Sequence, residues 1–423
     1  MSDISRRKFL AGAVAGGTSL ALTAPGASQT AQSYSQIIGA NERINIGIIG
    51  CGNRGRGAHM TGVNAHAKEE NIEIIAVCDP YRLHRQQAAA LTKKWTNREA
   101  QQYISHRELL ARDDIDAVMI ASCDHQHTTH LKDAAEAGKD IYVEKPLAME
   151  MDRLNAAVDA VKAANVIVQV GTQLRSMASF TGCKALYESG IFGRVSRIEQ
   201  IRNAERPYWY SYINKEVKKE DVEWGEFLMH RPWRPFDPVL FSGWYGFAEF
   251  SDGPLPGLGS HYIDLVHYIT GAEFPTSCVC MGGVYTWKDE NHFTCPDQIE
   301  AVWQYEEGFM SVYTTNFGNG FGNRFRLSGD AGVLKMDKWS EPVYTAEGGS
   351  KNKGTIRGEN KVTEIPMPDH FLDWLQCIRS RQTPNASIDA GYQHAVACLM
   401  AMESYRSGRR TIFDKESRTI NFG

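Results

Sequence analysis

Nearly unbroken apolar runs alternate with helix-like segments in the first third of the chain. Runs without alternation are typical of parallel strands that are buried on both faces. The segments between the runs have helical periodicity, as at 130–138 and 154–164. Strands and helices at this spacing predict a doubly wound parallel sheet in a domain over 44–172. The apolar runs occupy residues 44–50, 72–79, 116–121, 141–143 and 166–171.

The pattern changes after about residue 175 to alternating apolar and polar positions, which are typical of antiparallel strands with one exposed face. The alternating runs lie at 195–202, 277–287, 298–305, 310–316 and 323–328. Helices are predicted near 180–189 and over 370–406, and a loose hairpin or loop over 349–361. The predicted fold class is α/β, with a Rossmann-type parallel sheet followed by an α+β domain that has a largely antiparallel sheet. The α+β domain covers 173–369, and C-terminal helices and a tail over 370–423 pack back on the core.

Composition and charge exclude several classes of protein. The 423 residues are 42% hydrophobic and 23% charged, which excludes a disordered or fibrous chain. The 46 basic and 50 acidic residues give a net charge of −4, and no basic cluster has interleaved aromatic residues. A nucleic-acid partner is therefore not expected. The nine cysteines show no C-x-x-C or metal-type spacing, so neither a disulfide scaffold nor a zinc module is indicated.

The first 31 residues resemble a twin-arginine export signal. Residues 5–10 read SRRKFL and precede a weakly apolar stretch at 11–24, which is too short to span a bilayer. A basic tail before an ordinary helix is the alternative. Cleavage near residue 27 or 31 would leave an N-terminal arm over 32–43 and, because no cysteine precedes Cys51, no lipid anchor. We expect a protein that is exported folded to the periplasm and has no membrane partner after signal removal.

A dinucleotide site is predicted where the first apolar run ends. The residues GCGNRG at 50–55 follow it directly, and glycines there allow a tight turn and a close approach of the backbone to a pyrophosphate. The second run ends at Asp79, whose carboxylate can accept hydrogen bonds from both ribose hydroxyls. The negative charge of Asp79 favours NAD, and NADP is the alternative because Arg82 lies nearby. If no cofactor binds, the same residues would be only a glycine turn beside a helix-capping aspartate. The residues expected to bind the cofactor here are Gly50, Gly52, Asn53, Arg54 and Asp79.

Three further motifs extend this pattern. VEKPLA at 143–148 follows the strand predicted at 141–143, and the chain also carries DHQH at 124–127 and GSHYID at 259–264. With the glycine loop and Asp79, these motifs occur in the order typical of the glucose–fructose oxidoreductase, inositol dehydrogenase and rhizopine-catabolism (Gfo/Idh/MocA) family, which the chain resembles over roughly residues 44 to 415. The resemblance implies a Rossmann domain, a C-terminal open-faced sheet, and a substrate held between them over the nicotinamide.

The resemblance also implies a catalytic pair. Lys145 would hydrogen-bond the substrate hydroxyl and help to move its proton, since burial and a cationic nicotinamide lower the pKa of a lysine. His261 can serve as a general acid or base near neutral pH. Family members commonly carry an aspartate four residues before this histidine, where this chain has Gly257, so Lys145 and His261 remain as the pair. A surface lysine and a helix-capping histidine are the alternatives.

Loops at the carboxyl edge of the parallel sheet should lie beside the ribose and the nicotinamide. From these loops we expect the further cofactor-binding residues Asp124, His127, Glu144, Lys145 and Gln173. The three imidazoles at 125, 127 and 130 do not indicate a metal site, because no carboxylate or cysteine spacing completes one.

The substrate is expected to meet Arg175, His261 and Asp264. Arg175 follows the last parallel strand, where a solvated loop is the alternative, and Asp264 would either orient His261 or stabilise the first turn of a helix. The stretch 206–250 is rich in aromatic residues, whose faces stack on pyranose rings, although core packing or subunit contacts explain most of them equally well. A carbohydrate-sized pocket is therefore predicted.

These observations predict an NAD(P)-dependent oxidoreductase that takes hydride from a secondary hydroxyl of a sugar, polyol or glycoside. Because the periplasm offers no nicotinamide pool, the cofactor would stay tightly bound and be recycled. Two alternatives are a redox-neutral glycoside hydrolase or lyase that oxidises the sugar transiently, and a ligand-binding relic without catalysis, which Gly257 favours. By resemblance we also expect a homo-oligomer, a dimer or a tetramer.

Overall fold

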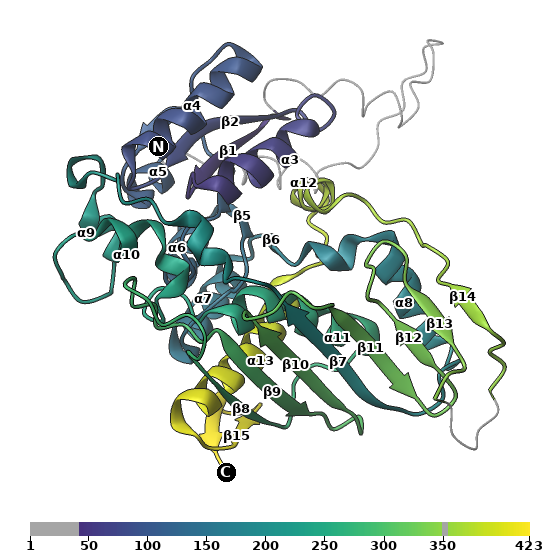
Figure 1. Cartoon of the computed structure of the whole chain (residues 1–423). Helices are drawn as coiled ribbons and strands as arrows, with labels where there is room; N and C mark the ends of the chain where they lie inside the picture. The colour runs from purple at the N-terminus through teal and green to yellow at the C-terminus, as the bar shows by residue number, and fades with distance from the viewer. Residues whose placement is uncertain (1–41, 349–353) are drawn as a thin grey trace, which may run out of the picture. The chain divides into compact units, whose positions relative to one another are not determined.

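A six-stranded parallel sheet forms the N-terminal part of the computed structural model, which describes residues 42–348 and 354–423 (Figure 1). The strand order β3-β2-β1-β4-β5-β6 places the switch between the two halves of the sheet beside β1. That order is typical of dinucleotide-binding folds, and the predicted doubly wound sheet is confirmed. The predicted export signal, 1–31, and the arm up to residue 41 lie outside the described residues. The strands are β1 (Ile44–Ile49), β2 (Ile72–Cys78), β3 (Gln101–Tyr103), β4 (Ala117–Ile120), β5 (Asp140–Val143) and β6 (Val168–Val170).

Helices cover both faces of this sheet. Ile46 and Ile48 of β1 pack with Trp374 in one core, and Val118 of β4 packs with Leu131 in the other. All five side chains are fully buried, which explains why the strand sequences are unbroken apolar runs. The helical elements are a π-helical turn (Gly55–Met60), α3 (Thr61–Ala65), α4 (Arg82–Thr96), α5 (His106–Leu110), α6 (His127–Glu136), α7 (Met151–Ala164) and, from far along the chain, α12 (His370–Ser380).

The second sheet has ten strands in the order β14-β13-β12-β11-β7-β10-β9-β8-β15-β16. Neighbouring strands are antiparallel except for β7 and β10. The largely antiparallel sheet predicted here is confirmed. Helices α8 (Ala178–Glu188), α11 (Ser260–Thr270) and α13 (Ile388–Ser407) pack together against one face of this sheet (Figure 1). The strands are β7 (Val195–Asn203), β8 (Ser277–Gly283), β9 (Gln298–Gln304), β10 (Met310–Asn316), β11 (Arg324–Gly329), β12 (Val333–Lys335), β13 (Val343–Thr345), β14 (Glu359–Lys361), β15 (Thr411–Asp414) and β16 (Thr419–Phe422).

Two edges of this sheet differ from the predicted elements. The C-terminal tail forms a hairpin of β15 and β16 beside β8, where only helices and a tail were predicted. Strands of four residues are too short for alternation to distinguish them from a loop. Within the segment predicted as a loose hairpin or loop, β14 pairs with β13, while residues 349–353 lie outside the described part of the chain.

Residues 206–250, called the aromatic segment below, fold into short helices that contact the carboxyl edge of the parallel sheet. Tyr81, just after β2, forms a β-bridge with Val222. The amide of His125, just after β4, donates to the Phe250 carbonyl oxygen at 3.2 Å. The segment therefore spans the edge where the predicted nucleotide site lies. Its helices are η5 (Tyr208–Tyr212), η6 (Lys219–Asp221), α9 (Trp224–Leu228), α10 (Pro238–Ser242) and η7 (Trp244–Gly246).

Candidate active site

The three glycines of the GCGNRG loop have different surroundings. Gly50 has a φ of 90°, and a Cβ there would lie 2.4 Å from the Ala121 backbone. A Cβ on Gly55 would lie 2.1 Å from the Gly50 carbonyl oxygen. At Gly52, the nearest described atom to an added Cβ is His84 Cε1, at 3.9 Å. The turn and its packing thus require glycine at positions 50 and 55. Gly52 leaves the backbone open at a cavity wall, which a pyrophosphate needs for close approach.

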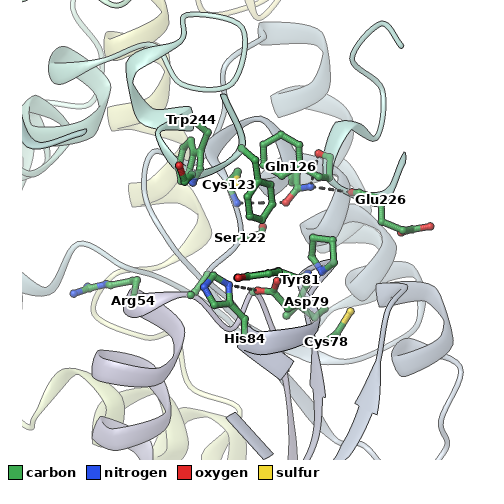
Figure 2. A pocket seen from close by; sticks show the side chains of 18 of the residues that line it. Arg54, Cys78, Asp79, Tyr81, His84, Ser122, Cys123, Gln126, Glu226 and Trp244 are labelled. Atoms are coloured by element: carbon green, nitrogen blue, oxygen red, sulfur yellow. Dashed lines mark hydrogen bonds and ion pairs between the residues drawn. The ribbon is translucent and has the colours of Figure 1, made fainter. Parts of the chain in front are cut away.

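Asp79 lies in the same cavity, directly after β2 (Figure 2). Its Oδ2 accepts a hydrogen bond from the Cys51 amide at 2.7 Å, and its Oδ1 accepts one from the Tyr81 amide at 2.8 Å. Burial by itself raises the pKa of Asp79, but His84 at 3.5 Å and the two amides bring the pKa below its ordinary value. Asp79 is therefore an anionic acceptor at the cavity wall, suited to ribose hydroxyls rather than to a phosphate.

The aromatic segment closes the other side of this space, which we call the nucleotide cavity. Phe227, Trp244 and Tyr245 line it opposite the glycine loop, and Trp244 is seen in Figure 2. Gln126 Nε2 donates to the carbonyl oxygens of Glu226 at 3.1 Å and of Phe227 at 2.9 Å. Side-chain hydrogen bonds from the loop after β4 thus hold the aromatic segment, which covers the nucleotide cavity, in place.

A second cavity, the reaction cavity, adjoins the first, and five residues line both: Arg54, Ala121, Ser122, Tyr212 and Tyr245. Its walls come from the loops after β4, β5 and β6, from the end of β7 and from the start of α11. The structure brings all predicted site residues except Arg175 and Asp264 to one of the two cavities. Those residues are Gly50, Gly52, Asn53, Arg54, Asp79, Asp124, His127, Glu144, Lys145, Gln173 and His261.

Lys145 and His261 both face the reaction cavity. Lys145 Nζ donates a hydrogen bond to the Gly257 carbonyl oxygen at 2.7 Å. His261 Nδ1 is buried and has no hydrogen-bond partner among the described residues. Burial, and after it the positive charge of Lys145, holds the pKa of His261 well below its usual value. His261 is therefore neutral at pH 7, and the pair offers a hydroxyl group one amine and one neutral imidazole.

Glu144 anchors the turn that carries Lys145. Its Oε1 lies 2.9 Å from His59 Nε2, 2.5 Å from Arg54 Nε and 3.3 Å from Gln173 Nε2. Burial by itself raises the pKa of Glu144, but the hydrogen bond from His59 and the charge of Arg54 hold the pKa well below its ordinary value. The ionised carboxylate fixes Arg54 where the two cavities meet.

His127 connects two loops of the site. Its Nδ1 lies 2.7 Å from the Pro146 carbonyl oxygen, and its Nε2 lies 3.0 Å from the Ser122 carbonyl oxygen. Burial lowers the pKa of His127 below its ordinary value, so the ring is neutral and donates to one of the two carbonyls. The residue holds the loop after β4 against the turn that carries Lys145.

Asp124 is a buried carboxyl group in the wall of the reaction cavity. It is 4% exposed, and Ser251 Oγ donates to its Oδ2 at 2.8 Å. Burial raises the pKa of Asp124 to about 7, and the Ser251 hydrogen bond and the charge of Lys145 offset only part of that rise. A carboxyl group that titrates near neutral pH can exchange a proton with a bound substrate.

The raised pKa of Asp124 predicts a pH dependence of stability. The group keeps its proton in the folded protein up to about pH 7 but loses it near pH 4 in the unfolded chain. Its contribution to the free energy of unfolding is thus complete below about pH 4 and is lost as the pH rises to about 7. Urea unfolding between pH 4 and pH 8 should show that the free energy of unfolding of the wild type falls relative to that of Asp124→Asn up to about pH 7. Above about pH 7 the difference between the two free energies should stay constant. A constant difference over the whole range would contradict the raised pKa.

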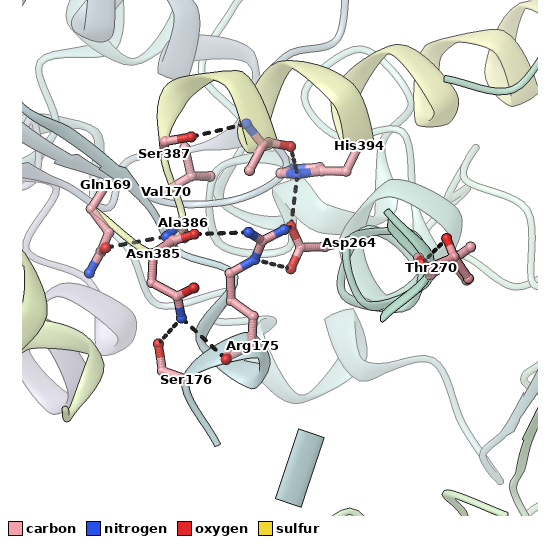
Figure 3. Close-up of polar contacts among 12 residues, drawn as sticks. Gln169, Val170, Arg175, Ser176, Asp264, Thr270, Asn385, Ala386, Ser387 and His394 are labelled. Atoms are coloured by element: carbon pink, nitrogen blue, oxygen red, sulfur yellow. Dashed lines mark hydrogen bonds and ion pairs between the residues drawn. The ribbon is translucent and has the colours of Figure 1, made fainter. Parts of the chain in front are cut away.

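Arg175 and Asp264, for which a substrate contact was predicted, are not among the residues that line the two cavities. Figure 3 shows their polar contacts. The two side chains bind each other, with Arg175 Nε 2.9 Å from Asp264 Oδ2 and Arg175 Nη2 2.7 Å from Asp264 Oδ1. Arg175 Nη1 also donates to the Asn385 carbonyl oxygen at 2.8 Å, and His394 lies 3.7 Å from Asp264. Asp264 points from α11 toward α13 and η4 (Gln173–Ser176), so it does not orient His261. A buried carboxylate needs such a partner, and the guanidinium fork supplies two hydrogen bonds.

Arg202 and Tyr208 are among the residues of the reaction cavity that sequence reasoning left unassigned. A Cβ on Gly257 would lie 2.6 Å from the Tyr208 hydroxyl, which is buried and has no hydrogen-bond partner among the described residues. The Tyr208 phenol thus occupies the space into which a side chain at position 257 would project. The aromatic run carried no signal for this contact. Alternation along β7 could have placed Arg202 on the inner face, with the buried Ile198.

Neither a metal cluster nor a membrane helix is found in the described ranges. Within residues 42–348 and 354–423, no three histidine, cysteine, aspartate or glutamate side chains are grouped to hold a metal ion. His125 Nε2 instead lies 2.9 Å from the Phe227 carbonyl oxygen, and His130 Nδ1 lies 2.9 Å from Ser122 Oγ. Over the same residues, no helix has both the length and the apolar character needed to cross a membrane.

Family comparisons match both parts of this structure. A model described as an oxidoreductase family with an NAD-binding Rossmann fold (GFO_IDH_MocA) matches residues 44–172. The model of the same family's C-terminal alpha/beta domain matches residues 226–412. The chain belongs to the Gfo/Idh/MocA oxidoreductase family. This Gfo/Idh/MocA protein has an NAD-binding domain, so the predicted NAD cofactor is confirmed.

Individual relatives differ in how much of this Gfo/Idh/MocA protein they match. It is 28% identical over 378 residues to scyllo-inositol 2-dehydrogenase (NAD(+)) of Bacillus subtilis, covering 86% of this chain and 95% of that protein. It is 33% identical over 174 residues to alpha-N-acetylgalactosaminidase of Shewanella oneidensis, covering 38% of this chain and 37% of that protein. The chain spans about half or less of the length of the first curated relatives that it matches. The solved structure of levoglucosan dehydrogenase in complex with NADH has the same fold, with a TM-score of 0.67 at 18% identity over 87% of this chain and 98% of that one.

Proposed function

We propose that this protein is an NAD-dependent oxidoreductase that acts on a secondary hydroxyl group of a sugar, polyol or glycoside. The observation that carries the proposal is the presence of Lys145 and a neutral His261 in a cavity that adjoins the nucleotide cavity. A hydroxyl group in that cavity meets a proton donor and a proton acceptor at once. Relatives named as inositol and levoglucosan dehydrogenases support the substrate class.

Some residues of the site would bind the cofactor, and others would transfer a proton. The glycine loop, Arg54 and Asp79 would hold the dinucleotide, since they line the nucleotide cavity with open backbone, a cation and a hydroxyl acceptor. When bound, NAD accepts hydride from the carbon that carries the hydroxyl. Lys145 Nζ, which donates to the Gly257 carbonyl oxygen, can donate a hydrogen bond to the substrate oxygen instead. An ammonium group has no lone pair, so Lys145 would first pass a proton to the neutral imidazole of His261, and the resulting amine would accept the hydroxyl proton.

The cover of the nucleotide cavity supports a cofactor that stays bound between turnovers. Release of a dinucleotide requires the aromatic segment to open, which breaks the hydrogen bonds from Gln126 to Glu226 and Phe227. Protein purified without added cofactor should therefore release a nearly equimolar amount of NAD when it is denatured, as measured by chromatography and mass spectrometry. Gln126→Ala should be isolated with less NAD than the wild type, and Gln102→Ala, at an exposed position, should not. Wild-type protein that is isolated empty and is active only with added NAD would reject retention but not the oxidoreductase.

A redox-neutral glycoside hydrolase or lyase is the second candidate, because Asp124 titrates near neutral pH. Oxidation of one sugar carbon acidifies the C–H bond beside it, and the Asp124 carboxylate can take that proton as the bond to the aglycone breaks. For a hydrolase, water would add to the unsaturated ketone left by this elimination before the hydride returns, which gives the free sugar; without that addition the product would be the unsaturated sugar of a lyase. The similarity to a protein named alpha-N-acetylgalactosaminidase supports this candidate over the matched segment.

Aryl glycosides separate the two candidates when no NAD is added. Release of the phenol without a keto-sugar product and without accumulated NADH would favour the glycosidase. A keto sugar with one equivalent of reduced cofactor and an intact aryl bond would favour the oxidoreductase.

We also propose export by the twin-arginine route to the periplasm, and assembly into a homo-oligomer. The proposal of export is supported by the sequence at residues 5–10.

The proposal of assembly is supported by exposed apolar side chains on one face of the second sheet. These are Val279 and Met281 on β8 and Met310 on β10, which are 48%, 81% and 45% exposed. Fractionation of cells and light scattering of the mature protein test these two proposals.

A further inference from the structure

Two arginine residues of the reaction cavity form no salt bridge with a described carboxylate, although the charge of one of them, Arg206, helps to lower the pKa of Asp289. Arg202, near the end of β7, and Arg206, three residues after it, both line the cavity. Neither forms an ion pair with a described residue, in contrast to Arg175, which binds Asp264 by two hydrogen bonds. An arginine at a cavity wall without a carboxylate has its donors available for a ligand.

Aromatic rings hold the two guanidinium groups in place. The Arg202 guanidinium carbon lies 5.4 Å from the centre of the Trp339 ring. The corresponding Arg206 carbon lies 4.4 Å from the Tyr210 ring centre and 5.7 Å from that of Trp287. Contact with an aromatic face restricts the plane of a guanidinium and leaves the N–H groups at its edge available for hydrogen bonds. The ring contacts therefore restrict the orientation of both guanidinium groups, of which Arg202 is half-buried and Arg206 is exposed.

The reaction cavity is electropositive although the chain carries a net charge of −4. Besides the two arginines, Lys145 and Arg54 line it. Its acidic groups are Glu144, which Arg54 and His59 already bind, and Asp124, which holds its proton up to about pH 7. Positive charge thus exceeds negative charge, so the cavity favours an anionic ligand over a neutral one.

We propose that Arg202 and Arg206 bind an anionic group of the substrate, so that the protein acts on an acidic carbohydrate. This inference rests on the proposed function and names its substrate class. A carboxylate matches the site best, because its two oxygens can accept parallel hydrogen bonds from one guanidinium. A hexuronic acid or a related sugar acid is therefore the expected substrate, and sulfate or phosphate esters of sugars offer the same anionic oxygens.

Binding to the NAD-loaded protein tests the proposal by calorimetry without requiring turnover. The probes are glucuronate, galacturonate and mannuronate, each compared with its parent hexose, together with glucose 6-sulfate and glucose 6-phosphate. At least one acidic probe should bind about tenfold or more tightly than its parent hexose. Arg202→Gln and Arg206→Gln should each reduce that ratio of affinities by about 10- to 100-fold, as expected for loss of a hydrogen bond to a charged group.

Arg197 provides the matched control. It lies on β7 five residues before Arg202, on the opposite face, and pairs with Glu199 at 2.8 Å. Arg197→Gln should leave the ratio of affinities unchanged. The anion site is rejected if no acidic probe binds more tightly than its parent hexose, or if the preference survives in both cavity variants.

The outcomes also separate this inference from the proposed function. Tight binding of only the sulfate or phosphate ester, lost in the variants, would keep the arginine site and assign an ester to it. An acid that binds through the arginines but never reduces the cofactor would reject the oxidoreductase and keep the anion site. Hydride transfer from neutral sugars, with no preference for acids, would reject only the anion site.

Discussion

Replacement of Lys145 by methionine is expected to slow turnover by about 10²- to 10⁴-fold, the range that a positioned acid or base contributes. Methionine keeps the apolar stem of the side chain but lacks the amine that donates to the Gly257 carbonyl oxygen. The glycine loop and Asp79 line the nucleotide cavity and are untouched, so the NAD content of the purified variant should equal that of the wild type. Steady-state kcat and the bound dinucleotide, measured on the same preparation, test both statements.

Two further variants sharpen this test. Lys145→Arg keeps a positive charge, but an arginine does not release its proton at working pH, so turnover should stay low if Lys145 moves a proton. Recovery of turnover in Lys145→Arg would show that only the charge matters. Lys132→Met removes a lysine that pairs with Glu136 on the surface of α6 and should behave like the wild type. An unchanged kcat in Lys145→Met would overturn the proposed chemistry.

Replacement of Asp264 by alanine is expected to lower the free energy of unfolding by about 3–5 kcal/mol, the cost of leaving one member of a buried ion pair without its partner. Asp264 is 1% exposed and Arg175 is 7% exposed, so water cannot replace the lost carboxylate. Because neither residue lines the reaction cavity, kcat per folded molecule should change little. Urea unfolding and kinetics below the transition measure the two quantities separately.

A paired variant controls for the size of this effect. Arg175→Met combined with Asp264→Leu removes both charges and should recover most of the lost stability. Arg197→Met breaks the exposed pair with Glu199 and should cost less than about 1 kcal/mol. Normal stability together with low turnover in Asp264→Ala would instead restore the role that the sequence suggested, contact with the substrate or orientation of His261.

The glycine at 257 has a packing reason as well as a catalytic consequence. A Cβ at this position would lie 2.6 Å from the Tyr208 hydroxyl, so a side chain there requires Tyr208 to move. The reaction cavity still contains Lys145, His261 and Asp124, three groups that can handle protons. Loss of the family's aspartate therefore does not by itself favour a relic without catalysis.

Local pattern determined the parts of this protein that depend on near neighbours. The unbroken runs at 44–50 and 116–121 predicted buried parallel strands, because burial on both faces leaves no polar position. The glycine loop and Asp79 were predictable for a similar reason, since a strand, a turn and the end of the next strand meet at one sheet edge. Lys145 was found through its motif, which lies at the end of β5 on the same edge.

Tertiary structure alone decided which charged side chains line the cavity and which form buried ion pairs away from it. Arg175 and Asp264 are 89 positions apart and bind each other across two elements, and no local spacing encodes that pairing. Tyr208 reaches Gly257 only because the aromatic segment folds back over the sheet edge. A carboxylate or guanidinium is stabilised by whatever partner the packed chain places beside it, so its role follows from the folded neighbourhood rather than from its residue type.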